Sequence, residues 1–256
     1  MVDDPGGRRA TQGALELWTM ATPPPAEHVL AKWHALLDAE ERAQAARFVF
    51  AANRHEYIAA HGLARLLLSH VAARAGGVWV APAAWCFYRQ PGGKPTLLEP
   101  EGGISLAFNL SHTGGRVAVA TGQGALELGV DVEAVSRKVD PALARQYFTP
   151  REAAWLDGQT GTACNEAFLR LWTLKEAYLK AHGGGLPAGL DSVGFDLSGA
   201  TPRLVTGDPA PGAWWFGQWR LAPEAENADH VLALACRGGR GAPNVTPRRL
   251  AAWQWP

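Results

Sequence analysis

The stretch Gly129-Val130-Asp131-Val132-Glu133 alternates apolar and acidic side chains, which is typical of a β-strand with one buried face. Successive side chains of a strand point to opposite faces, so Val130 and Val132 face the core while Asp131 and Glu133 lie side by side. The two carboxylates repel each other, and a divalent cation is the simplest group that would offset them. Oxygen ligands favour Mg²⁺, Mn²⁺ or Ca²⁺ over Zn²⁺. A solvated acidic pair at the end of a strand is the alternative.

The strongest helix signal follows at Asn165 to Lys180, which reads NEAFLRLWTLKEAYLK. Its apolar side chains recur at three- and four-residue spacing, and a glycine-rich segment from Gly183 ends the pattern. Glu176 and Lys180 lie one turn apart at the edge of the apolar stripe, so they could complete a site where two packed units meet. An ordinary Glu–Lys pair on a solvated helix surface is the alternative.

The composition describes an ordinary globular protein. Hydrophobic residues make up 47% and charged residues 19% of the 256 residues, and 24 acidic residues balance 24 basic ones. A balanced charge argues against a protein that coats nucleic acid or an anionic membrane. The three cysteines are scattered, which fits neither a disulfide framework nor a zinc site. No apolar run approaches the ~18 residues of a membrane span. We therefore predict a cytoplasmic protein.

The two acidic motifs together resemble the signature of the 4′-phosphopantetheinyl transferase superfamily. That signature is G-[IV]-D-[IV]-E followed by W-x-x-K-E-A, and residues 129–133 and 172–177 match it. Three further blocks match in order and approximate spacing, namely GGKP at 92–95, FNLSHTGG at 108–115 and FTPREAAWL at 148–156. The resemblance covers nearly the whole chain from about Arg42, and the length indicates the larger, monomeric surfactin-type class.

The resemblance implies an enzyme that moves the 4′-phosphopantetheine arm of coenzyme A onto a serine of an apo acyl, peptidyl or aryl carrier protein. Adenosine 3′,5′-bisphosphate is the second product. The carrier could serve fatty-acid, polyketide or nonribosomal-peptide synthesis. The implied fold is α+β (α/β), a pseudo-dimer of two similar lobes, each a small, mostly antiparallel sheet packed with helices. We place the lobes at 1–128, which contributes to coenzyme A binding, and 129–256, which carries the metal-binding and catalytic motifs.

The resemblance also implies roles for the charged residues of the two motifs. Asp131, Glu133 and Glu176 match the family's ligands for Mg²⁺, with Mn²⁺ as the other possible metal, and Glu176 also counts among the catalytic candidates. Lys175 and Lys180 match lysines near the phosphates of coenzyme A. Lys180 is the stronger candidate because it shares a helix side with Glu176, whereas Lys175 could be a solvated surface residue.

Glu152 matches a family glutamate that is proposed to take the proton of the carrier serine. The local sequence offers a second interpretation, because Thr149-Pro150-Arg151-Glu152 has the form of a helix capping box. In a capping box the Glu152 carboxylate would bind the backbone at the start of the helix. The general-base role and the capping role both stay open.

The resemblance assigns coenzyme A contacts to two upstream blocks. Ser111 and His112 lie in the second block, and His112 matches a phosphate-binding histidine. Lys94 and Pro95 match the block that lies against the adenine, although GGKP by itself predicts only a turn.

One position departs from the family. Relatives carry a basic residue that grips the 3′-phosphate where this chain has Glu56. We expect another base to substitute for it, first of all Arg54, with Arg42 and Arg47 as the alternatives.

A basic surface is expected because carrier proteins are usually acidic. The candidates, with a solvated face as the alternative, are Arg137, Lys138, Arg145 and Arg151. Two rival functions stand beside the transferase: a non-catalytic coenzyme A-binding protein of the same fold and a metal-dependent phosphate-ester hydrolase. The three carboxylates with Lys180 argue against the first rival, and the blocks at 92–95 and 108–115 argue against the second.

Overall fold

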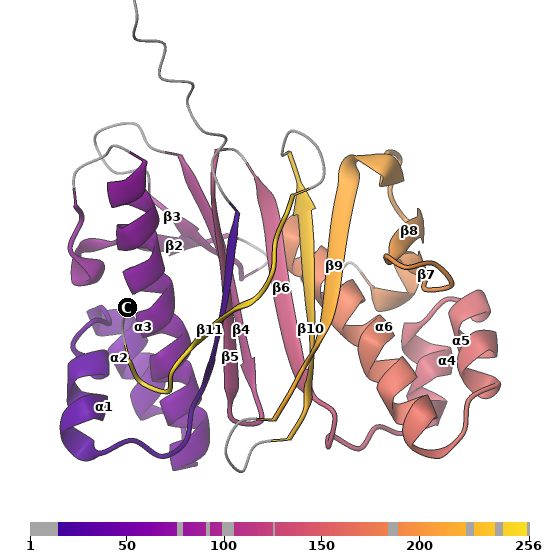
Figure 1. Cartoon of the computed structure of the whole chain (residues 1–256), viewed down its shortest axis with the longest axis horizontal. Helices are drawn as coiled ribbons and strands as arrows, with labels where there is room; N and C mark the ends of the chain where they lie inside the picture. Colours follow the sequence, from indigo (N-terminus) through magenta and orange to yellow (C-terminus); the bar gives the residue numbers. More distant parts are fainter. Residues whose placement is uncertain are drawn as a thin grey trace, which may run out of the picture.

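The structure is a computed structural model that describes residues 15–75, 79–90, 93–98, 105–124, 126–183, 189–223, 228–238 and 243–254. Two larger sheets lie side by side, and one long helix covers the outer face of each (Figure 1). From one side to the other, the layers are helix, sheet, sheet and helix. Gly92 of the GGKP block lies outside the described residues.

The first lobe holds a four-stranded sheet in the order β11-β1-β5-β4 and a small hairpin, β2-β3. Strand β11 runs parallel to β1, and the other strand pairs of the lobe are antiparallel. Its elements in chain order are β1 (Glu16–Ala21), α1 (Glu27–His34), α2 (Ala39–Ala46), α3 (Ala51–Arg74), η1 (Pro82–Ala84), β2 (Phe87–Arg89), β3 (Pro95–Leu97), β4 (Leu106–Thr113) and β5 (Arg116–Gln123).

The second lobe holds an antiparallel sheet in the order β6-β10-β9 and a hairpin, β7-β8. The elements that follow β5 are β6 (Glu127–Ala134), η2 (Pro141–Leu143), α4 (Ala144–Tyr147), α5 (Pro150–Asp157), α6 (Gly161–His182), η4 (Leu190–Ser192), β7 (Gly194–Asp196), β8 (Arg203–Thr206), η5 (Pro211–Ala213), β9 (Trp214–Leu221), β10 (His230–Arg237) and β11 (Arg248–Leu250).

The core has three layers because each large sheet is apolar on both faces. One cluster packs α3 against the first sheet, another packs α6 against the second, and a third fills the space between the sheets. Val130 and Val132 of β6 belong to the middle cluster. Alternation along the strand therefore turns Asp131 and Glu133 away from it, toward α6.

The expected fold class, small antiparallel sheets packed with helices, is confirmed. The helix predicted over Asn165–Lys180 is also confirmed, although it begins earlier, at Gly161, and ends at His182, with Gly183 as its C-cap at φ of 78°. Strand β6 starts at Glu127, and the late strand β11 pairs with β1 of the first sheet, so the end of the chain returns to the first lobe. No helix in the described ranges is long and apolar enough to cross a membrane.

Candidate functional site at the seam of the two lobes

Helix α6 crosses β6 in direct backbone contact, and a glycine makes this possible. A β-carbon on Gly129 would lie 2.0 Å from the carbonyl oxygen of Ala177. Any larger residue would push the helix away from the strand. Asp131 and Glu133 lie on the same strand face as Gly129, so this close approach brings Glu176 and Lys180 of α6 next to them. We call Asp131, Glu133, Glu176 and Lys180 the seam cluster.

Lys180 and Ser111 both bind one oxygen of Asp131. The Lys180 Nζ donates to Asp131 Oδ1 at 2.7 Å, and Ser111 Oγ donates to the same atom at 2.9 Å. Ser111 lies on β4 of the first lobe and also accepts from the backbone of Val132 on β6. The carboxylate of Asp131, which is 5% exposed, therefore joins the two lobes.

The other two carboxylates of the seam cluster hold protons unusually well. Burial raises the pKa of Glu133 to about 7, and the neighbouring charge of Asp131 adds to this rise. Burial and Asp131 also raise the pKa of Glu176. Arg137, which donates to Glu133 Oε1, and Lys180 oppose both shifts. The cluster thus has more buried negative charge than Lys180 and the neighbouring Arg137 offset.

Two oxygens of the seam cluster fit a metal ion. Asp131 Oδ2 and Glu133 Oε2 are buried and find no hydrogen-bond partner among the described residues. Leaving such atoms unpaired is costly, and a hard cation such as Mg²⁺ prefers oxygen ligands. In the described part of the chain, no three His, Cys, Asp or Glu side chains lie close enough together to hold a metal. The other oxygen of each carboxylate binds a cation: Asp131 Oδ1 binds Lys180, and Glu133 Oε1 binds Arg137.

Lys175 lies beside Glu176 in the sequence but inside the second lobe. Its side chain is 0% exposed, and its Nζ lies 2.7 Å from Glu152 Oε2. The same Nζ donates to the carbonyls of Leu190 and Val193 at 2.8 and 2.5 Å. The solvated alternative for Lys175 is wrong, and the structure does not bring this lysine to the seam cluster.

Glu152 is held in the same buried network. It completes the predicted capping box. Glu152 Oε2 accepts from the amide of Thr149 at 2.9 Å, and Thr149 Oγ1 accepts from the amide of Glu152. Its Oε1 accepts from the amide of Phe195 at 2.8 Å. The carboxylate is buried, and these contacts lie within the second lobe. The general-base role of Glu152 stays a prediction.

His112 lies on β4, just before the turn to β5, with Glu56 of α3 facing it. His112 Nδ1 lies 3.4 Å from Glu56 Oε2, and Glu56 Oε1 accepts from the amide of Gly115 at 2.6 Å. Arg54 lies two residues before Glu56 on α3 and is half-buried. The other two candidate bases bind near α2, since Arg42 donates to Leu37 and Arg47 to Gln44.

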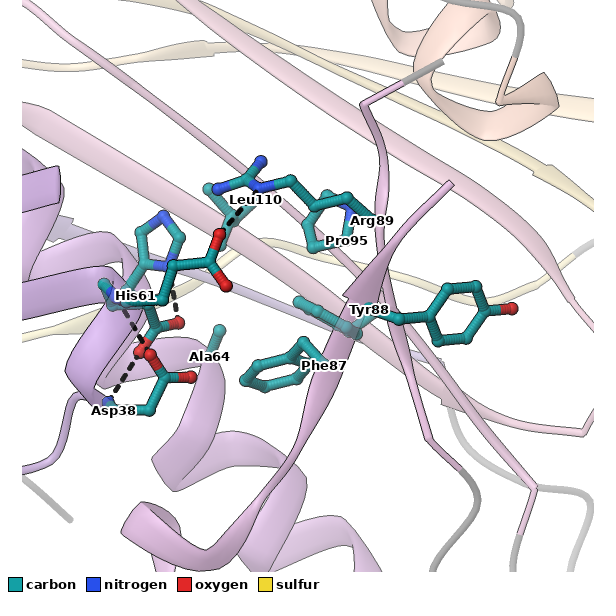
Figure 2. Close-up of a pocket in the computed structure, with 11 residues that line it drawn as sticks. Asp38, His61, Ala64, Phe87, Tyr88, Arg89, Pro95 and Leu110 are labelled. Carbon is teal, nitrogen blue, oxygen red and sulfur yellow. Dashed lines mark hydrogen bonds and ion pairs between the residues drawn. The ribbon is translucent and has the colours of Figure 1, made fainter. Parts of the chain in front are cut away.

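A pocket of about 160 Å³ opens in the first lobe between α2, α3 and the β2–β3 hairpin (Figure 2). Pro95 lines it, together with Asp38, Glu40, Glu41, His61, Ala64, Phe87, Tyr88, Arg89, Phe108 and Leu110. Sequence reasoning did not single out Glu41, His61 or Arg89. A signal for Glu41 was available, because Asp38 and Glu41 form the capping box of α2.

Lys94, just before β3, connects the β2–β3 hairpin to the second lobe. Its Nζ donates to the carbonyls of Ala181 and Leu128 at 2.8 and 3.1 Å. Burial lowers the pKa of Lys94 to about 8, although the negative charge of Glu127 acts to raise it. The side chain therefore supports the β6–α6 contact that carries the seam cluster.

Comparisons with known proteins fit this two-lobed arrangement. The family model described as 4′-phosphopantetheinyl transferase superfamily matches residues 127–235, and a second, described as 4′-phosphopantetheinyl transferase, N-terminal, matches 22–124. The chain is 31% identical to the 4′-phosphopantetheinyl transferase HetI of Nostoc sp. over 225 residues, which cover 88% of each chain. The chain belongs to the 4′-phosphopantetheinyl transferase superfamily.

Further relatives agree with this assignment. The transferase is 32% identical to a phosphopantetheinyl transferase of Thraustochytrium sp., over 93% of this chain and 85% of the relative. It is 30% identical to a 4′-phosphopantetheinyl transferase of Bacillus subtilis, over 64% of this chain and 67% of the relative. The two family models meet between residues 124 and 127, where β6 begins and the seam cluster follows.

Proposed function

We propose that this transferase moves the 4′-phosphopantetheine arm of coenzyme A to a serine of an apo carrier protein in a Mg²⁺-dependent reaction. The observation that carries the proposal is the seam cluster, where buried carboxylates with two unpartnered oxygens lie beside a lysine at the junction of two lobes. The carrier would belong to fatty-acid, polyketide or nonribosomal-peptide synthesis. We further propose that the enzyme works as a monomer in the cytoplasm.

Asp131, Glu133 and Glu176 would hold the Mg²⁺. When bound, the ion would supply positive charge that offsets the negative charge of the pyrophosphate. The two unpartnered oxygens and the raised pKa values of Glu133 and Glu176 support this assignment, because each reflects a shortage of positive charge.

In the proposed reaction the serine oxygen forms a bond to the β-phosphorus of coenzyme A. The bond from that phosphorus to the bridging oxygen breaks, and adenosine 3′,5′-bisphosphate leaves with the bonding electrons. Lys180, which is 31% exposed, can turn its Nζ from Asp131 to a phosphate oxygen of the leaving group. Glu152 is the candidate for accepting the serine proton.

The pocket beside Pro95 is our candidate for the adenine end of coenzyme A. Its volume of about 160 Å³ suits one flat ring system but is too small for the whole coenzyme A molecule. The lining of Phe87 and Pro95 offers apolar faces, and the carboxylates of Glu40 and Glu41 can accept from an amino group. Tyr57 stacks on His61 at 4.1 Å and contacts the ring of His112, which connects the pocket to the proposed phosphate site.

The carrier protein would dock on the exposed basic side of α4 and α5. Arg145 and Arg151 are both about three-quarters exposed, and Trp155 is also partly exposed there. Such a surface suits an acidic partner that also offers apolar side chains. Lys138, which is exposed in the segment before α4, is a further candidate, whereas Arg137 binds Glu133 of the seam cluster.

One experiment separates this proposal from its rivals. Apo carrier protein is incubated with the enzyme, coenzyme A and Mg²⁺, and its intact mass is measured. A gain of one phosphopantetheine group supports the transferase. Consumption of coenzyme A without a mass gain would indicate a hydrolase, and unchanged coenzyme A and carrier would indicate a non-catalytic binding protein.

A further inference from the structure

The end of β4 and the turn to β5, residues 112–115, are held from both lobes. From the first lobe, Glu56 Oε1 accepts from the amide of Gly115 at 2.6 Å. From the second lobe, His230 Nε2 lies 3.2 Å from the carbonyls of both Thr113 and Gly114. Gly114 has φ of 55°, and a β-carbon there would come within 2.8 Å of Ala134. These contacts give the turn one position relative to both lobes.

The second oxygen of Glu56 determines which ring nitrogen of His112 carries the proton. Glu56 Oε2 lies 3.4 Å from His112 Nδ1, and the Glu56 residue is only 8% exposed. A carboxylate accepts hydrogen bonds and cannot donate them, so Nδ1 must carry the proton of this contact. The other ring nitrogen, Nε2, is not engaged by any hydrogen bond among the described residues, and the side chain is partly exposed.

We propose that Glu56 is a positioning residue that fixes His112 for binding a phosphate group of coenzyme A. The inference rests on the proposed function, since it takes coenzyme A as the substrate of this site. With Nδ1 donating to Glu56, Nε2 can donate to a phosphate oxygen only when the ring is an imidazolium. The Glu56 carboxylate balances that ring charge and holds the ring plane. The acidic residue at a position where a base was expected therefore acts through the histidine and does not touch the phosphate.

The substitution Glu56→Gln tests this role because it changes one hydrogen bond and spares the other. The glutamine oxygen can still accept from the Gly115 amide, which leaves its NH₂ group facing His112. That group donates, so Nδ1 must become the acceptor and lose its proton. The matched control is Glu16→Gln, which alters a buried carboxylate of the same lobe that binds Trp18 and Arg74.

The first measurement is the ¹⁵N spectrum of the His112 ring in the enzyme without coenzyme A. The expected result is a protonated Nδ1 in the wild type and in Glu16→Gln, and an unprotonated Nδ1 in Glu56→Gln. An unprotonated Nδ1 in the wild type, or no change in Glu56→Gln, would overturn the proposal. Because no substrate is present, this result does not depend on whether the proposed function is right.

The second measurement is the transfer kinetics of the same proteins. Glu56→Gln should raise the KM for coenzyme A about tenfold and leave kcat within about twofold, because the neutral ring then donates from Nε2 without its positive charge. In a His112→Ala background the same substitution should change KM by less than about twofold. An equal rise in both backgrounds would show that Glu56 does not act through His112. Absence of transfer in the wild type would instead refute the proposed function.

Discussion

Two neighbouring residues of α6, Lys175 and Glu176, lie in two different buried sites. The carboxylate beside Lys175 has all its hydrogen bonds made, and the carboxylates beside Glu176 do not. Lys175 pairs with Glu152, and backbone or side-chain donors engage both oxygens of that carboxylate. Glu176 faces the seam cluster, where two carboxylate oxygens have no partner among the described residues. A buried network with every atom satisfied indicates a structural role, and buried charge left unsatisfied indicates a place for a ligand.

The largest expected effect follows from removing a seam carboxylate. Asp131→Ala should lower the transfer rate by about 10³-fold or more, since Asp131 is a proposed metal ligand and also the partner of Lys180. The folded state should persist, as judged by circular dichroism and the melting temperature. Full activity in this variant would remove the metal assignment and end the contrast between the two regions.

The buried Lys175–Glu152 pair should contribute to the stability of the folded protein. Lys175→Met leaves the Glu152 carboxylate buried without its cation, so the free energy of unfolding should fall by about 3–5 kcal/mol in urea denaturation. Lys32→Met, on the exposed side of α1, is the control and should change it by less than about 0.5 kcal/mol. A loss below about 1 kcal/mol in Lys175→Met would show that the buried pair is not a structural element.

The companion variant Glu152→Gln tests the general-base role. If the contacts of Glu152 are purely structural, the folded variant should transfer at a rate within a few-fold of wild type. A drop of about 10²-fold or more would instead support Glu152 as the base, because that is the contribution expected of proton transfer. Single-turnover rates, measured at a temperature where both proteins are folded, distinguish the two outcomes.

The arginines between β6 and α6 differ in the same way, since one is bound to a carboxylate of the seam cluster and two are exposed. Arg137 binds Glu133 in the seam, whereas Arg145 and Arg151 are exposed on the proposed docking side. Reversing Arg145 and Arg151 to Glu should raise the KM for the carrier protein about tenfold and spare the KM for coenzyme A. Steady-state kinetics with each substrate varied in turn measure both values. An unchanged KM for the carrier would refute this docking surface.

A pH-dependent effect concerns Lys94, which supports the β6–α6 contact. Its pKa in the folded protein is about 8, below the ordinary 10.5, so the folded state binds fewer protons than the unfolded state between these pH values. Stability from this group therefore rises as the pH increases from about 8 to 10.5. The difference in unfolding free energy between wild type and Lys94→Met should grow over that range. A flat difference would mean that Lys94 is not held in a desolvated position.

Local patterns predicted the parts of the site that local forces determine. The alternation around Asp131, the periodicity of α6 and the capping box of Glu152 all correspond to elements of the structure. The burial of Lys175 also had a signal, because it lies four residues from both Leu171 and Leu179 and so falls within the apolar stripe. The sequence showed a lysine next to a glutamate and did not reveal that they face different neighbours.

The remaining features depend on contacts between distant segments. Glu56 and His112 are 56 residues apart, and β11 joins β1 from the far end of the chain. No periodicity links such segments, since their pairing is decided by how the two sheets and their helices pack. The role of Glu56 could therefore be proposed only once α3 and the turn after β4 were seen together.

The most direct test of the seam cluster as a metal site is a Mn²⁺ titration of the enzyme with coenzyme A present, followed by electron paramagnetic resonance. The wild type should bind one Mn²⁺ that Mg²⁺ displaces. Asp131→Ala should weaken binding by at least about tenfold, whereas Lys175→Met should bind like the wild type. Undiminished binding in Asp131→Ala, or an equal loss in Lys175→Met, would contradict the account.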